Sequence, residues 1–475
     1  MSATLPAPSA PAAPIPPAGP GAPGETGSGA ATGPAAARGS DIGRNVRRAA
    51  GPLFRLRAQA AAALLLLAAL LVTAVLGFAD TADRVHQLTA VSEPRAAAAG
   101  RLYQALADLD AQRAKSLVMG YAAPDPADPT ATPVLVDDGV LAGLTAQADQ
   151  RDAAAALSQL AAAEPQQVQD LLNTLGLYDA WTGTEEYFVT SQAAPVVGHP
   201  VAGAVDNYAQ ADALLQTKLL PDVAALRDAA DRQVAADRSS AHDAALAYAV
   251  VLGVLCLAAA LALLWWQRDL TVRHNRILNL PLVVATACVA ALLIGTASAL
   301  VGAAGEVDSA VSAGYTPYAR LSQASVAAAD AEARQSRWVV DTDYRPALAA
   351  DFHSDAGNVK QLLAQDRSPA AAVVRQRFDA YLGSDSGLRQ VADGGDVNGA
   401  ALRLTGVGRD DVAFTYYDFS VHLGALAATD AAAFSSHAST ASDDLSGWPG
   451  ISAAVCAVAM LLVLGGVRPR LREFA

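Results

Sequence analysis

Two apolar runs joined by a short basic connector decide the fold: AALAYAVVLGVLCLAAALALLWW at 244–266, QRDLTVRHNRILNL at 267–280 and PLVVATACVAALLIGTASALVGAA at 281–304. Each run holds about 20 residues without a charge, roughly what a helix needs to cross a hydrocarbon layer about 30 Å thick. The connector carries Arg268, Arg273 and Arg276 against one acid, Asp269. Basic loops stay in the cytoplasm, so the pattern predicts a membrane hairpin whose connector is cytoplasmic.

Two further apolar runs lie nearer the chain ends, one at 58–78 before this hairpin and one at 449–467 after it. Six arginines precede the first run and three follow the last: Arg38, Arg44, Arg47, Arg48, Arg55 and Arg57, then Arg468, Arg470 and Arg472. These charges predict four spans of a plasma membrane with both termini in the cytoplasm. A cleavable signal peptide is the alternative for the first run, but the long lead before it favours an uncleaved anchor.

The terminal segments outside the spans are expected to be cytoplasmic. Residues 1–57 begin with a Pro-, Ala- and Gly-rich stretch that has few large apolar side chains and ends in the arginine-rich segment. Such a composition buries too little apolar surface to offset its conformational entropy. We therefore expect a disordered tail at 1–57, with 468–475 as a second short tail.

The two long segments between the spans are acidic. Residues 79–243 hold 23 acids and 10 bases, and residues 305–448 hold 19 acids and 11 bases. This is the charge asymmetry of a membrane protein whose long segments lie outside the cell. An acidic outer surface also argues against nucleic acid as a partner.

Alanine dominates these segments and helical spacing recurs, so the predicted class is an all-α membrane protein with an extracytoplasmic four-helix bundle in each segment. Glu164-Pro165 and Ser368-Pro369 are expected to separate helices, because proline fits the first helical turn. The proline-rich stretch 120–139 and the glycine-rich stretch 383–408 are predicted to be loops. Weak local similarity, Arg101-Leu102-x-Gln104-Ala105 with Arg320-Leu321-x-Gln323-Ala324, predicts that the second half is a parallel duplication of the first.

No catalytic pattern stands out in the sequence. The histidines lack the spacing of a zinc site, and there is no nucleophile elbow, phosphate-binding loop or Cys-x-x-Cys pair. The acids are interpreted as solvated residues on helix faces. We therefore expect a protein that is not an enzyme and that uses no metal and no cofactor.

A ligand site outside the membrane is expected where arginines lie between helices, because a guanidinium binds a carboxylate with two hydrogen bonds. The candidates are Arg113 in the first outer segment and Arg334, Arg337 and Trp338 in the second. A purely structural role is the alternative, with Arg334 stacking on Trp338 or Arg337 pairing with Asp341 one turn later.

The candidates for contact with a cytoplasmic partner are the polar residues of the connector, Arg268, Arg273, His274 and Arg276. With spans of about 20 residues on either side, the connector over 267–280 has about 14 residues, which is too few for an output domain. We therefore expect an outer signal to pass to a separate protein. Topology and contact with the lipid bilayer are the alternative role of these residues. Small residues in the spans, such as Gly253 and Gly295, would permit close helix packing or a homodimer.

The Trp265-Trp266-Gln267-Arg268 hairpin, the paired outer segments and the short connector resemble the GlnX-type membrane proteins of actinobacteria over residues 44–475. The resemblance implies a transducer between an extracytoplasmic solute-binding lipoprotein, which holds an amino acid, and a cytoplasmic serine/threonine kinase. The outer bundles separately resemble the periplasmic four-helix domains of chemoreceptors.

Two hypotheses about function follow from these features. The first is a non-enzymatic transmembrane sensor or transducer that relays nutrient status to a cytoplasmic partner. The second is a structural or assembly protein whose outer bundles dock other envelope proteins. Transport is disfavoured, because the middle turns of the apolar runs contain no ionisable residue.

Overall fold

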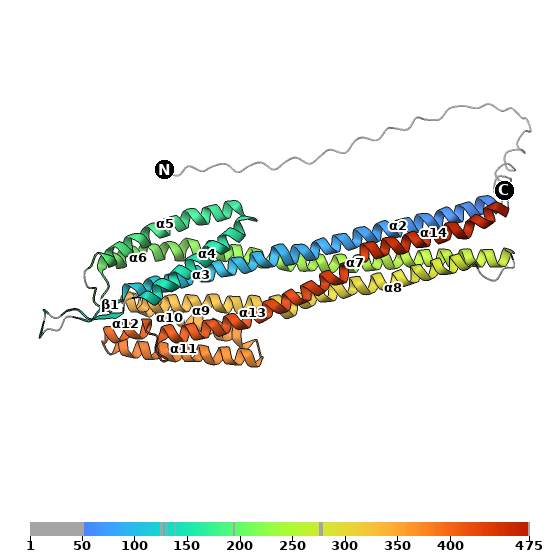
Figure 1. The fold of residues 1–475 in the computed structure, drawn as a ribbon. Coiled ribbons are helices and arrows are strands. Elements are labelled where there is room, and N and C mark those ends of the chain that lie inside the picture. Colours follow the sequence, from blue (N-terminus) through green and yellow to red (C-terminus); the bar gives the residue numbers. More distant parts are fainter. Residues whose placement is uncertain are drawn as a thin grey trace, which may run out of the picture. The chain divides into compact units, whose positions relative to one another are not determined.

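The structure is a computed structural model that describes residues 52–123, 127–128, 130, 132–137, 139–192, 195–274 and 279–473. In this part of the chain nearly every element is a helix, and the strands are limited to one short hairpin (Figure 1). The predicted all-α class is therefore confirmed. Of the disordered tail expected over 1–57, residues 1–51 fall outside the described residues, as does Arg276. Residues 52–57 are helical, because α2 (Pro52–Gln87) begins at Pro52, so the prediction was wrong for them.

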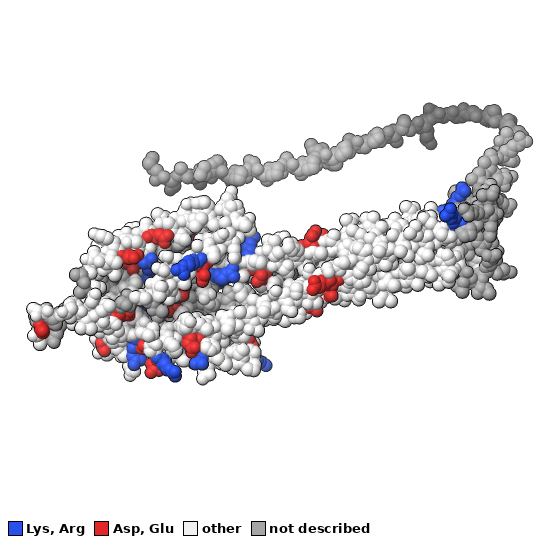
Figure 2. Space-filling model, viewed as in Figure 1, with Lys and Arg blue, Asp and Glu red and all other residues white. Residues whose placement is uncertain are grey.

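Four helices in the described ranges are long and apolar enough to cross a membrane, and they include α2 (Pro52–Gln87), α7 (Leu220–His274), α8 (Leu280–Ser309) and α14 (Trp448–Glu473). Their inward faces form one core that includes Leu70, Leu252 and Leu292. The ring of Phe78 on α2 stacks on Trp448 of α14, with centroids 5.7 Å apart. On the face drawn in Figure 2, Lys, Arg, Asp and Glu side chains are scarce along these helices.

The first outer half contains α3 (Glu93–Leu117), α4 (Val140–Ala161), α5 (Pro165–Thr190), α6 (Ala202–Leu214) and the beginning of α7. Among the described residues its main buried cluster is aliphatic apart from Tyr178, while Tyr208 of α6 packs into the core shared with the second half. Leu102, Leu160, Leu215 and Val223 bring α3, α4 and α7 together with the turn that precedes α7. The predicted break at Glu164-Pro165 is confirmed, because α4 ends at Ala161 and α5 begins at Pro165.

The second outer half contains α9 (Thr316–Val340), α10 (Arg345–Ala364), α11 (Pro369–Asp393), α12 (Val397–Thr405) and α13 (Val412–Leu445). Its core holds a chain of packed rings, in which Phe378 lies 4.9 Å from Phe419 and 5.9 Å from Tyr381 between centroids. Ser368 caps α11 as predicted, with its side chain accepting a hydrogen bond from the amide of Ala371.

Two predicted loops differ from the structure. The stretch 383–408 was expected to be a loop, but α11 continues to Asp393 and α12 occupies most of the remainder. Burial of Leu388 and Ala392 on one face of α11 outweighs the roughly 1 kcal/mol by which each glycine disfavours a helix. Within 120–139, two short antiparallel strands, β1 (Gly120–Tyr121) and β2 (Leu135–Asp137), pair with each other, so that prediction was also wrong in part.

Three wider π-helical turns interrupt the long helices: η1 (Leu88–Ser92), η2 (Leu215–Leu219) and η3 (Ala310–Tyr315). Each ends two residues before a proline, at Pro94, Pro221 and Pro317. A proline ring clashes with the carbonyl four residues earlier and supplies no amide hydrogen. A turn with one extra residue is a known way to accommodate such a disruption without ending the helix.

Candidate functional site

The two outer halves meet along α3 and α9, the helices that follow the first and third apolar spans (Figure 1). The facing surfaces are rich in small residues, including Ala99, Gly100 and Ala329, all of which are buried. A Cβ atom added to Gly100 would lie 2.8 Å from the hydroxyl oxygen of Ser322 on α9. Small side chains therefore bring the two helices close together, and the charged residues of one helix reach the other.

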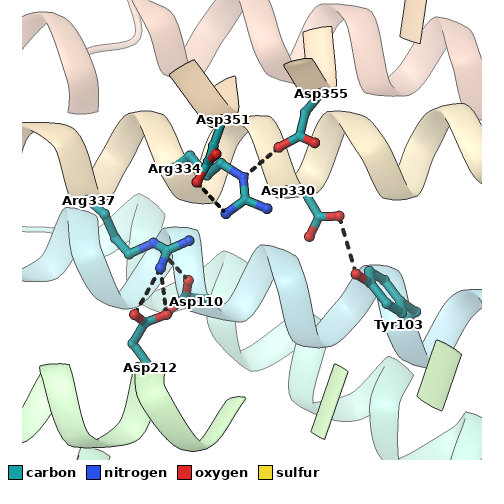
Figure 3. Close-up of polar contacts among 8 residues, drawn as sticks. All are labelled: Tyr103, Asp110, Asp212, Asp330, Arg334, Arg337, Asp351 and Asp355. Carbon is teal, nitrogen blue, oxygen red and sulfur yellow. Dashed lines mark hydrogen bonds and ion pairs between the residues drawn. The ribbon is translucent and has the colours of Figure 1, made fainter. Parts of the chain in front are cut away.

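Arg337 of α9 is held by carboxylates from the first half (Figure 3). Its Nη1 donates to both oxygens of Asp212 on α6, at 2.9 and 2.8 Å. Its Nε lies 3.6 Å from Oδ2 of Asp110 on α3, and Tyr208 donates a hydrogen bond to the other oxygen of Asp110 at 3.0 Å. Burial raises the pKa of Asp110 to about 7 even with the guanidinium beside it. This ion pair joins three helices at the boundary between the halves.

Arg334 lies one turn earlier on α9 but faces α10 of its own half (Figure 3). Its Nε donates to Oδ2 of Asp355 at 2.5 Å, and its Nη1 lies 3.7 Å from Oδ2 of Asp351. Next to it, Asp330 accepts a hydrogen bond from the hydroxyl of Tyr103 on α3 at 3.2 Å. Arg334 therefore fixes α9 to α10, while Asp330 links α9 to α3.

Trp338 lies between two guanidinium groups. Arg345 is 4.6 Å and Arg389 4.7 Å from the centroid of the Trp338 ring. Arg389 also pairs with Asp385 at 2.8 Å, which places its charge inside the second half. The cation–π partners of Trp338 are thus Arg345 and Arg389, whereas the sequence suggested Arg334.

Arg113 belongs to a different place, a groove of about 640 Å³ between α3, α4 and α5. Its Nη1 lies 3.6 Å from Oε2 of the exposed Glu186. Beside it, Glu185 is buried, and this burial raises the pKa of Glu185 to about 8. The four predicted ligand residues therefore do not line one common cavity, and the carboxylates of the chain itself engage all three arginines.

The predicted cytoplasmic cluster is described only in part. Arg268 is exposed on α7, close to Gln267, whose amide donates to the hydroxyl of Thr286 on α8 at 3.0 Å. Arg273 and His274 form the last residues of α7, and their side chains fall outside the described part, as does Arg276 entirely.

A buried charge cluster lies where α3, α4, α9 and α13 meet, and it was not predicted from the sequence. Lys115 donates to Glu332 across the boundary, and their side chains are 4% and 1% exposed. Asp108 of α3 and Asp149 of α4 lie beside this pair. The pKa of Asp149 is raised to about 9, mainly by burial and to a smaller extent by the neighbouring carboxylates. The interpretation of the acids as solvated was therefore wrong for Asp149 and Glu332.

This cluster borders a cavity of about 310 Å³ whose wall includes Asp108, Lys115 and Glu332 together with aromatic residues of α13. Asp108 and Lys115 lie two helical turns apart, on the same stripe of α3 as the buried Ala111. This spacing in the sequence indicated that charged side chains face the core. It did not indicate which helix they contact. In the described residues no group of three or more His, Cys, Asp and Glu side chains is arranged to hold a metal ion.

Comparison with known proteins gives one match. Residues 84–239 match the model of the actinobacterial sensor domain, a segment that runs from the end of α2 into α7. No curated protein and no solved structure is significantly similar to the chain. The match supports a role in sensing or signalling, and together with the four apolar helices it indicates a membrane protein.

Proposed function

We propose that the chain is a non-enzymatic transmembrane sensor or transducer that relays nutrient status outside the cell to a cytoplasmic partner. One observation carries this proposal: the segment that matches a sensor domain begins and ends in helices that continue into the apolar spans. The chain from α2 through η1 to α3 contains no loop, and the same holds from α6 through η2 to α7. A shift of α3 or α7 outside the membrane is thereby passed to the spans.

The boundary between the halves is where such a shift would arise. Arg337 with Asp110 and Asp212, and Lys115 with Glu332, are ion pairs between elements of the two halves. Buried ion pairs need good geometry to offset the loss of water, so they favour a few discrete helix arrangements. A signal that changes the relative stability of two such arrangements would move α3 against α9, by the 1–2 Å typical of shifts at helix interfaces.

For the outer partner we propose a solute-binding lipoprotein that presents a bound amino acid. Large apolar side chains are exposed on α5: Leu177 is 60%, Trp181 42% and Tyr187 67% exposed. Leu177 and Trp181 lie one turn apart, so they share a face of the helix. Exposed apolar surface of this kind is typical of a protein-binding site. Replacement of Leu177 and Trp181 by Ser is expected to abolish capture of the lipoprotein without unfolding α5.

For the inner partner we propose a serine/threonine kinase that contacts Arg268, Arg273, His274 and Arg276. The resemblance to GlnX-type proteins supports this partner, and the exposed guanidinium of Arg268 is available for it. Replacement of the three arginines by Gln should lower kinase recovery in a pull-down from detergent extracts. Retained recovery would exclude this contact, and recovery of cell-wall enzymes alone would favour the structural alternative.

Transmission is tested by disulfide formation between η1 and α7. Ser92 donates a hydrogen bond to Asp237, so cysteines at these two positions lie within reach of each other. The test uses a chain whose native Cys256, Cys288 and Cys456 are replaced by Ala, so that no other disulfide forms. The cross-linking yield is expected to change when the amino-acid-loaded lipoprotein is added to membranes.

A control pair at Lys360 and Asp379, on α10 and α11, should give the same yield throughout when both pairs are linked with a bifunctional thiol reagent, because a long lysine side chain spans the gap to Asp379 and a direct disulfide is too short for it. Equal yields at Ser92 and Asp237 in membranes where lipoprotein binding has been verified would contradict the transmission model.

A further inference from the structure

The cavity at the boundary between the halves has walls of two kinds. One wall is apolar and aromatic, and it is formed by Met119 after α3 and by Phe414, Tyr416 and Tyr417 on α13. Its charged wall holds Asp108, Lys115 and Glu332. A volume of about 310 Å³ suits a small organic molecule. Apolar walls with a few convergent polar groups are the usual composition of a ligand site.

Acidic groups outnumber basic groups around the cavity. Three carboxylates, Asp108, Asp149 and Glu332, surround one ammonium group, that of Lys115. Lys115 donates to Oε1 of Glu332, whereas Oε2 of Glu332 is buried without a hydrogen bond of good geometry, although Asp108 and Tyr416 lie beside the carboxyl. Glu332 is only 1% exposed and lines the cavity. A buried acceptor without a well-placed donor destabilises a protein, so a donor in the cavity would stabilise this one.

We propose that this cavity binds a small organic ammonium ion that carries an apolar or aromatic group. The ammonium donates hydrogen bonds to Oε2 of Glu332 and to Asp108, and the apolar part lies against Phe414 and Tyr417. An anionic ligand is disfavoured, because only Lys115 would attract it and that group is already paired. This ligand would act on the chain directly, in addition to any outer protein partner, and it would join α3 to α9 and α13.

The pH dependence of binding offers a second test of this proposal. The titratable groups around Glu332 come from four helices: Asp108 and Lys115 on α3, Asp149 on α4, Tyr381 on α11 and Tyr416 on α13. Burial, only partly offset by Lys115, raises the pKa of Glu332 to about 8. A bound cation favours the ionised carboxylates and releases protons. Binding should therefore tighten between pH 6.5 and 8 by up to about tenfold per pH unit for each proton released.

The test uses the full chain in detergent and titration calorimetry with 2-phenylethylamine, n-butylamine, 3-phenylpropionate and 2-phenylethanol. Both amines remain charged below about pH 10, while the acid and the alcohol keep the apolar group without the positive charge. We expect 2-phenylethylamine to bind with a dissociation constant below about 1 mM at pH 8. The acid and the alcohol should bind at least about tenfold more weakly, the difference of one charged hydrogen bond.

Glu332→Gln should weaken amine binding by at least about tenfold. Glu185→Gln is the matched control and should leave it unchanged. Glu185 is also 1% exposed, also has an unpartnered Oε2 and also has its pKa raised to about 8, but it does not line this cavity. If Glu332→Gln does not fold, Tyr417→Ala, which changes a 66% exposed residue of the wall, should weaken binding by about threefold.

Three results would overturn the proposal: no binding of either amine up to about 10 mM, equal binding of the amine and the alcohol, or equal losses in Glu332→Gln and Glu185→Gln. Binding is measured on the isolated chain without lipoprotein or kinase. Its failure is therefore distinguishable from failure of the transducer proposal, which the cross-linking of Ser92 and Asp237 tests.

Discussion

The two outer halves are both helical, but they fill their interiors differently. The second half packs the rings of Phe378, Tyr381 and Phe419 against one another, all of them nearly inaccessible. The first half has a mainly aliphatic core. Grooves of similar size lie in both halves, about 640 Å³ between α3, α4 and α5 and about 650 Å³ between α10 and α11, so the halves differ in what fills their cores. Close packing of rings leaves little room to rearrange. We therefore expect the core of the second half to be the more rigid, and the first half, which contains the sensor-domain match, to adapt more readily.

The largest expected effect concerns this difference in packing. Phe378→Ala in the second half should lower the free energy of unfolding by about 4 kcal/mol, because it leaves a cavity among rigid rings. Leu157→Ala should lower it by only about 2 kcal/mol, since Leu157 already borders the groove. Thermal unfolding of the purified chain, followed by circular dichroism, measures both.

Leu388→Ala controls for side-chain size, because Leu388 is fully buried in the second half. Its loss should exceed that of Leu157→Ala. Equal losses for the two leucines would remove the packing difference on which the comparison rests.

The second prediction concerns the ion pairs of neighbouring arginines. Arg337→Leu should destabilise the chain by about 3 kcal/mol, because it leaves Asp110 buried without its cation. Lowering the pH from 8 to 6 should recover much of the loss, since Asp110, whose pKa is already raised to about 7, then takes up a proton. Arg334→Leu should cost less, because its partners Asp355 and Asp351 are 21% and 57% exposed and keep part of their water, whereas Asp110 is 1% exposed. The unfolding temperature at the two pH values distinguishes the cases.

The third prediction is a loss of stability at high pH that originates mainly in the first half and at the boundary. Burial raises the pKa of Glu185 from 4.5 to about 8, so the folded chain holds a proton there that the unfolded chain has released. Stability therefore falls as the pH rises through this window and levels off above about pH 8. Between pH 6 and 9 the contribution of this carboxyl is about 2 kcal/mol.

Glu185→Gln should flatten this pH dependence. Asp379→Asn, at a 66% exposed side chain on α11, should leave it unchanged. A wild-type chain with constant stability from pH 6 to 9 would show that these carboxylates are already ionised when folded.

The smallest expected effect compares two helix starts. Ser368→Ala should lower the free energy of unfolding by about 1 kcal/mol, because the cap hydrogen bond to the amide of Ala371 is lost. α5 begins with Glu164-Pro165 and has no side-chain cap. Glu164→Ala should therefore change stability only through the partly exposed ion pair with Arg95. A larger loss in Glu164→Ala than in Ser368→Ala would contradict the assigned caps.

Local sequence signals predicted much of this fold. Runs of apolar residues located the four long helices, and prolines located the starts of α5 and α11. The helix over 383–393 could not be predicted, since it depends on the burial of Leu388 against residues distant in sequence. The partners of Arg337 and Lys115 were missed for the same reason: one sequence shows which face of a helix is polar but not which helix it meets. The duplication of the halves and the cytoplasmic contacts of Arg268 remain predictions.

The π-helical turn at Leu88–Ser92 has a consequence for any residue-by-residue study of the first long helix. The π-helical turn contains one residue more than an α-helical turn. This extra residue changes the direction of all following side chains around the helix axis by about 100°. A helical wheel drawn with one constant period from Phe78 to Leu117 therefore assigns the residues either before or after this turn to the wrong face of the helix. Deletion of one residue there would restore the phase and rotate the span against α3, which turns Phe78 away from Trp448.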